Sequence, residues 1–103
     1  MTSSETAAQL RQMIAVLESE RQALAALDIE ALLAATQEKQ ELCGQLAPAG
    51  PLPDAGECRA LAEQARALNE INRRVRNLLA AQVATRIDAL AGTTRIYSAS
   101  RAA

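Results

Sequence analysis

Few residues of this chain have side chains that could catalyse a reaction or hold a metal ion. The 103 residues include no histidine, so the chain lacks an imidazole base and the usual partner of cysteine in a zinc site. The four glycines are scattered, and no glycine-rich loop is predicted to cradle a phosphate group. Most carboxylates fall on the expected solvent faces of helices. We therefore expect no enzymatic activity, no bound metal and no cofactor.

The chain has two cysteines, Cys43 and Cys58. Two are too few for a disulfide framework. Both fall on expected helical faces that flank one connector, so they could lie near each other. The favoured interpretation is that both are small buried hydrophobic residues in a reducing compartment.

Four polar residues fall on or beside apolar helix faces. Glu20 and Lys39 each occupy a position of an apolar seam. In a helical hairpin they would lie within about one turn of each other and could pair, or each could extend to solvent at the edge of a thin bundle. Asn69 and Asn72 lie beside the apolar stripe of a third segment. Buried asparagine can fix the register of coiled coils, so a structural role is favoured over contact with a partner. Asn72 is nevertheless kept among the candidate partner-binding residues.

The first element that positions these residues is a helix predicted over residues 5–27. Thr2 and Glu5 have the spacing of a capping box. Apolar residues then recur at steps of three and four, with Glu20 as the exception. The seam consists of Leu10, Met13, Leu17, Glu20, Leu24 and Leu27.

The apolar pattern changes phase at Asp28, and a second helix is predicted over residues 29–46. Its stripe consists of Leu32, Ala35, Lys39, Leu42 and Leu46. Asp28 could cap this helix, so that the chain turns back. Alternatively one helix continues and the phase change is a stutter. The turn is favoured, but no glycine or proline lies between Ala23 and Cys43 to decide the question.

A proline-rich connector, residues 47–53, precedes a long helix predicted over residues 54–91. Asp54 and Glu57 have the spacing of a second capping box. Gly92 is expected to end the helix in a left-handed conformation, and the tail over residues 93–103 is expected to be mobile. The stripe of this helix consists of Leu61, Leu68, Ile71, Val75, Leu79, Val83, Ile87 and Leu90.

The lengths of the three segments predict the fold. At a rise of about 1.5 Å per residue, the helices would extend about 34, 27 and 55 Å. We expect an all-α fold, an antiparallel bundle or coiled coil of three helices, with the last one long and a flexible C-terminal tail. With a turn at Asp28, an apolar strip between Leu78 and Leu90 should remain uncovered.

The charge is unevenly distributed, although the net charge is only −1. Residues 1–53 carry seven acidic and three basic side chains, and residues 54–103 carry five acidic and eight basic ones. The basic excess suits an acidic helical neighbour better than nucleic acid, because Tyr97 is the only aromatic residue available for stacking. No signal peptide and no apolar run of about 20 residues is evident, which predicts a cytoplasmic protein without membrane insertion.

The order of these features resembles the FlgN family, the flagellar type III secretion chaperones of the hook-filament junction proteins. The resemblance extends over about residues 10–99. The matching segments are Leu17–Glu20, Ala23–Leu24, Asp28 with Leu32 or Leu33, Glu38–Lys39 with Leu42, Ala65–Asn72, Val83–Arg86, Leu90 and Tyr97. The family often has glycine after the second asparagine and around the tyrosine. Here Arg73 and Ser98–Ser100 stand at those places.

The resemblance implies a helical chaperone that binds the C-terminal helix of the junction proteins FlgK and FlgL. It also implies docking on the export gate protein FlhA, with Tyr97 as the matching residue. The residues assigned to the substrate helix are Asn72, Arg76, Leu79, Val83, Arg86, Ile87 and Leu90. Leu79, Val83, Ile87 and Leu90 could instead be ordinary core. The alternative function is a structural coiled-coil or homodimerisation module without an export role.

Overall fold

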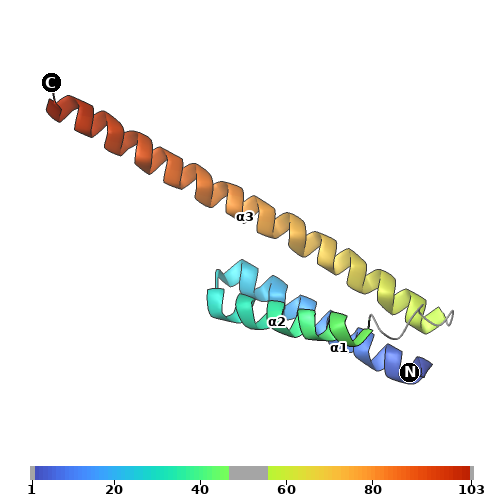
Figure 1. Ribbon diagram of the computed structural model, residues 1–103. Coiled ribbons are helices and arrows are strands. Elements are labelled where there is room, and N and C mark those ends of the chain that lie inside the picture. Colours follow the sequence, from blue (N-terminus) through green and yellow to red (C-terminus); the bar gives the residue numbers. More distant parts are fainter. Residues whose placement is uncertain (1, 47–55, 103) are drawn as a thin grey trace. The chain divides into compact units, whose positions relative to one another are not determined.

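The computed structural model describes residues 2–46 and 56–102, and these residues form three helices without a strand. Helix α1 spans Ser3–Ala26, α2 spans Ile29–Leu46 and α3 spans Gly56–Ala102 (Figure 1). The predicted fold class, all-α with three helices and the last one long, is confirmed. The connector over residues 47–53 and the capping residue Asp54 lie outside the described residues.

Helix α1 begins with the predicted capping box. The Glu5 backbone N–H donates to Thr2 Oγ1 at 3.1 Å, and the Thr2 backbone N–H donates to Glu5 Oε2 at 3.2 Å. Each side chain thus satisfies a backbone donor that the first helical turn leaves without a partner. The helix itself begins at Ser3, two residues before the predicted start.

A two-residue turn at Leu27 and Asp28 separates α1 from α2. Leu27 adopts a left-handed backbone conformation, with φ 54° and ψ 36°. Its N–H donates to the Leu24 carbonyl at 3.2 Å, and the Asp28 N–H donates to the Ala23 carbonyl at 2.9 Å. These two bonds form a Schellman motif. Asp28 Oδ1 then accepts from the Ala31 N–H at 3.1 Å and caps α2. The turn is confirmed, and the continuous helix with a stutter is wrong.

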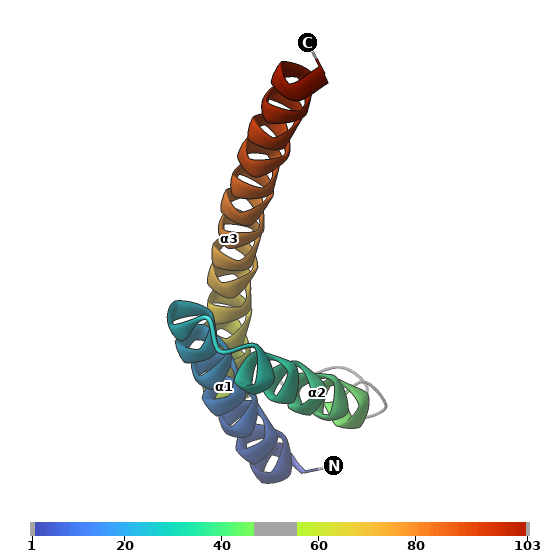
Figure 2. The same ribbon diagram turned by 90° about the vertical axis from the view of Figure 1, so that its left-hand side faces the viewer.

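The chain divides into two compact units, residues 1–73 and residues 74–103. In the first unit α2 returns along α1, and the Gln9 side chain donates to Gln45 Oε1 at 3.5 Å near the ends opposite the turn. Figure 2 shows the short turn that joins the two helices. This antiparallel hairpin is the framework on which the first part of α3 packs.

The first part of α3 runs in the same direction as α1. Near its start Cys58 is buried against Ala7 and Leu10, and further on Asn72 donates to the Leu17 carbonyl at 2.8 Å. Arg11 and Glu57 form an ion pair at the surface. The main core cluster consists of Met13, Ile14, Val16, Leu17, Ala35, Leu42 and Ala65. All three helices therefore contribute to this main core cluster.

Helix α3 extends through Gly92 to Ala102, so the predicted helix end at residue 91 is wrong, while the mobility of residues 93–103 stays a prediction. A glycine inside a helix costs about 1 kcal/mol relative to alanine, which weakens a helix without ending it. No proline follows Pro53, so no residue here removes a backbone donor and forces a break.

Candidate functional site

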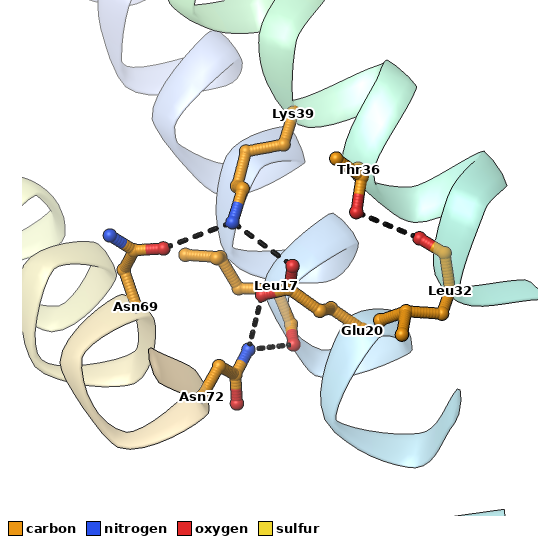
Figure 3. A network of polar contacts seen from close by, with 7 residues as sticks. All are labelled: Leu17, Glu20, Leu32, Thr36, Lys39, Asn69 and Asn72. Atoms are coloured by element: carbon orange, nitrogen blue, oxygen red, sulfur yellow. Dashed lines mark hydrogen bonds and ion pairs between the residues drawn. The ribbon is translucent and has the colours of Figure 1, made fainter. Parts of the chain in front are cut away.

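Four polar side chains from all three helices meet within the first unit. This polar cluster consists of Glu20 on α1, Lys39 on α2, and Asn69 and Asn72 on α3 (Figure 3). Lys39 Nζ lies 3.0 Å from Glu20 Oε2 and donates to Asn69 Oδ1 at 3.2 Å. Asn72 Nδ2 donates to Glu20 Oε1 at 2.9 Å and to the Leu17 carbonyl at 2.8 Å. The cluster thus links each helix to the other two.

Glu20 and Asn72 lie in the interior, each with an exposed fraction of 0%. A buried carboxylate is costly unless it is paired and hydrogen-bonded, and here both Glu20 oxygens have donors. The predicted pairing of Glu20 with Lys39 is confirmed, and extension of Glu20 to solvent is wrong. Sliding one helix by a turn would separate these partners, so the cluster fixes the alignment of the three helices.

The structure places Asn72 inside the bundle rather than on a surface. Its amide nitrogen is occupied by Leu17 and Glu20, while its Oδ1 is buried without a hydrogen-bond partner. A side chain in this position is not available to a partner helix, so Asn72 is removed from the partner-binding residues. The structural role that the sequence favoured for Asn72 agrees with these contacts. Asn69 is exposed and reaches the cluster only through Lys39.

The two cysteines differ in environment. Cys58 is buried and Cys43 is exposed, and neither forms a disulfide bond. The expectation that both are buried is wrong for Cys43, because the inner face of α2 passes through Leu42 and leaves the next residue outside. Within the described ranges, no three His, Cys, Asp or Glu side chains are grouped so that they could hold a metal ion.

The second unit carries an exposed apolar face on α3. We call Leu79, Val83, Ile87 and Leu90 the C-terminal stripe. Leu79 is half-buried, while the exposed fractions of the other three are 53%, 59% and 70%. Leu78, beside the stripe, is 60% exposed. The predicted uncovered strip between Leu78 and Leu90 is therefore present, and these residues are not core in this structure.

Arginines flank the C-terminal stripe. Arg76 is half-buried and Arg86 is exposed. In residues 74–103 the sequence has five arginines and one acidic residue, Asp88, whereas residues 1–73 have eleven acidic and six basic residues. The two units thus have opposite net charge. The electrostatic potential around the stripe is therefore expected to be positive.

Arg73, the last residue of the first unit, forms an ion pair with Glu70 on the same helix. Arg73 Nε and Nη2 donate to the Glu70 carboxylate at 2.9 and 2.7 Å. These hydrogen bonds, with the attraction between the charges, raise the pKa of Arg73 above its ordinary value. Arg73 therefore keeps its charge throughout the physiological pH range. Tyr97 lies within α3, but its side chain falls outside the described part of the structure.

A second exposed apolar surface was missed by the sequence reasoning. Leu27, Ile29 and Leu33 lie at the turn between α1 and α2, with exposed fractions of 65%, 62% and 64%. We call them the hairpin patch. Ile29 and Leu33 lie one helical turn apart, outside the stripe that α2 buries. The spacing of Ile29 and Leu33 could have indicated this second apolar surface from the sequence alone.

These features define an all-α protein with a buried polar cluster and two exposed apolar surfaces. The chain matches no family model, no curated protein and no solved structure. None of the described helices is both long and apolar enough to cross a membrane.

Proposed function

We propose that the protein is a cytoplasmic export chaperone of the flagellar type III secretion system. It binds the C-terminal helical region of the hook-filament junction proteins FlgK and FlgL and delivers them to the export gate. The observation that supports this proposal most is the exposure of Val83, Ile87 and Leu90 on α3. The family resemblance of the sequence supplies the identity of the partner.

An amphipathic partner helix binds by laying its apolar face on the C-terminal stripe. Residues spaced by three and four present a continuous face along α3. Full burial of each large apolar side chain contributes about 1.5–3 kcal/mol, from which the cost of association and ordering is subtracted. Because the gain and the cost are of similar size, we expect the complex to be weak and reversible, which suits a chaperone that must release its cargo.

Charge sets the orientation of the bound helix. Arg86 lies one residue before Ile87 on α3 and is exposed, so an acidic residue of the partner can bind its guanidinium in a bidentate pair. Such contacts at the rim of an interface act mainly on the association rate and on partner selection. Tyr97, further along α3, is the residue proposed to contact the export gate protein FlhA.

The proposed substrate site is tested with Val83→Asp and Ile87→Asp. Each places a charge in the centre of the stripe, so each should abolish capture of a FlgK C-terminal peptide in a pull-down. Helicity measured by circular dichroism should remain close to wild type, since both side chains are exposed. Gln82→Asp, which adds the same charge beside the stripe, is the matched control and should retain binding. Loss of the fold in the stripe variants would show that these residues are core and contradict the proposal.

The proposed docking role is tested with Tyr97→Ala. Peptide capture should be unchanged, because the substitution lies outside the stripe, while binding to the cytoplasmic part of FlhA should weaken. Both affinities can be measured by isothermal titration calorimetry on the same preparation. An equal loss of both would argue against separate sites.

The alternative is a homodimerisation module without an export role, in which a second copy covers the stripe. The opposite charge of the two units favours it as a second candidate. Light scattering with and without the junction-protein peptide distinguishes the two functions. A tight dimer that the peptide does not alter would support the module.

A further inference from the structure

The hairpin patch includes a leucine, Leu27, at a turn position where glycine would fit with less strain. Leu27 is held in the left-handed region with φ 54°, where the Cβ atom of an L-residue crowds the backbone. Glycine would complete the same Schellman motif without that cost. The Leu27 side chain is 65% exposed, so little burial in the core compensates for the strain. A large apolar side chain presented to solvent at this turn indicates a binding surface.

Helix α2 adds two further exposed apolar side chains close to the turn. Ile29 and Leu33 lie one turn apart, at 62% and 64% exposed. Asp28 and Glu30 lie beside them, and both are exposed. The hairpin patch is therefore apolar with an acidic rim, whereas the C-terminal stripe is apolar with arginines at its rim.

We propose that the hairpin patch of one copy binds the C-terminal stripe of a second copy. Both surfaces expose large aliphatic side chains, and the acids of one complement the arginines of the other. The contact joins a region with an acidic excess, residues 1–73, to a region with a basic excess, residues 74–103. Pairing of two stripes, or of two hairpin patches, would bring like charges together.

One consequence rests on the proposed function. A second copy and a substrate helix would use the same stripe, so the two complexes exclude each other. The copy–copy contact then shields the stripe until a substrate displaces it. Formation of the contact itself does not depend on the identity of the substrate.

Photo-crosslinking of the full chain tests the pairing. A benzophenone amino acid replaces Leu33, and isotopically heavy and light copies are mixed before irradiation. We expect heavy–light products that join the peptide containing residue 33 to the tryptic peptides 77–86 or 87–95. Products confined to one copy, products within residues 1–73, or no product at all would overturn the proposal.

Serine substitution provides a second measurement. Leu27→Ser with Leu33→Ser should raise the dissociation constant of the copy–copy contact in sedimentation equilibrium by at least about 100-fold, near the lower limit for the loss of two buried leucines. Gln37→Ser with Gln40→Ser, on exposed positions of α2, is the matched control and should leave the constant unchanged. An unchanged constant in the leucine variant, at wild-type helicity, would overturn the proposal.

The same variants separate this proposal from the proposed function. The Leu27→Ser, Leu33→Ser variant should capture the junction-protein peptide at least as well as wild type, because its stripe is intact and no longer shielded. Val83→Asp should lose both dimer and peptide. If neither the wild type nor the serine variant binds the peptide while the copy–copy contact responds as expected, the chaperone function fails and the pairing stands. If the wild type binds the peptide and the serine variant does not, the hairpin patch belongs to the partner site and the pairing is overturned.

Discussion

The two parts of α3 have the same apolar period and opposite environments. Over residues 56–73 the helix contributes Cys58, Ala65 and Asn72 to the interior. Over residues 74–92 no residue is buried, although Val83, Ile87 and Leu90 continue the stripe at steps of four and three. An apolar period thus predicts which face of a helix is apolar enough to be buried. Whether that face becomes core or a binding surface depends on what packs against it.

The largest expected difference between the two regions is the loss of unfolding free energy when a large apolar side chain is replaced by alanine. Leu17→Ala removes a side chain that is 1% exposed and should lower the free energy of unfolding by about 2–5 kcal/mol. Ile87→Ala removes a side chain of similar size that is 59% exposed, and the change should stay within about 0.5 kcal/mol. Urea unfolding followed by circular dichroism measures both, at a protein concentration where the chain is monomeric. Equal losses would show that the C-terminal stripe is covered within the monomer.

A somewhat smaller effect is expected in the polar cluster. Lys39→Met leaves the Glu20 carboxylate without its ammonium partner and should cost about 2–4 kcal/mol in unfolding free energy. Glu20→Gln combined with Lys39→Met removes the buried charge as well, so the double variant should be more stable than Lys39→Met alone. Double-mutant cycles in urea measure this coupling. A double variant less stable than Lys39→Met would show that the charge of Glu20 itself is stabilising.

The smallest effect, with the opposite sign, is expected at the turn. Leu27→Gly should raise the unfolding free energy by about 0.5–1 kcal/mol, since glycine adopts the left-handed conformation without a steric cost. Leu27→Ala is the control and should give no gain, because alanine keeps the Cβ atom. Both are measured at a protein concentration where the chain is monomeric. A gain of equal size from alanine would show that exposure of the leucine, not its backbone, is the destabilising factor.

Much of the packed region was predictable because local chemistry and tertiary packing agree there. The seam of α1 and the stripe of α2 follow a strict period, and their residues are buried or half-buried as far as Leu24 and Leu46. Glu20 and Lys39 interrupt those seams at positions that lie side by side in an antiparallel hairpin. A turn at Asp28 therefore predicts that the two side chains pair. The turn itself followed from the phase change and from a residue, Asp28, whose carboxylate can cap a helix.

The other features of the fold and the site depend on small energy differences and on tertiary contacts that the sequence pattern does not reveal. Gly92 is a common residue at helix ends, but its cost is small beside the hydrogen bonds of the flanking turns, and the helix continues. Nothing at Leu27 signals a left-handed backbone, since that conformation is imposed by the two bonds that close the turn. Asn72 could be assigned to core or surface until the position of α1 was known.

The parallel course of α1 and the first part of α3, residues 56–73, has a consequence for the nascent chain. The hairpin closes through contacts between neighbouring segments, which form fast, and it can fold while the ribosome is still making the later residues. Asn72 arrives 52 positions after Glu20 and must close a long loop to reach it. Until residue 72 has been synthesised, Glu20 Oε1 lacks the hydrogen bond from Asn72. The buried cluster can therefore be completed only after synthesis has passed well beyond the hairpin.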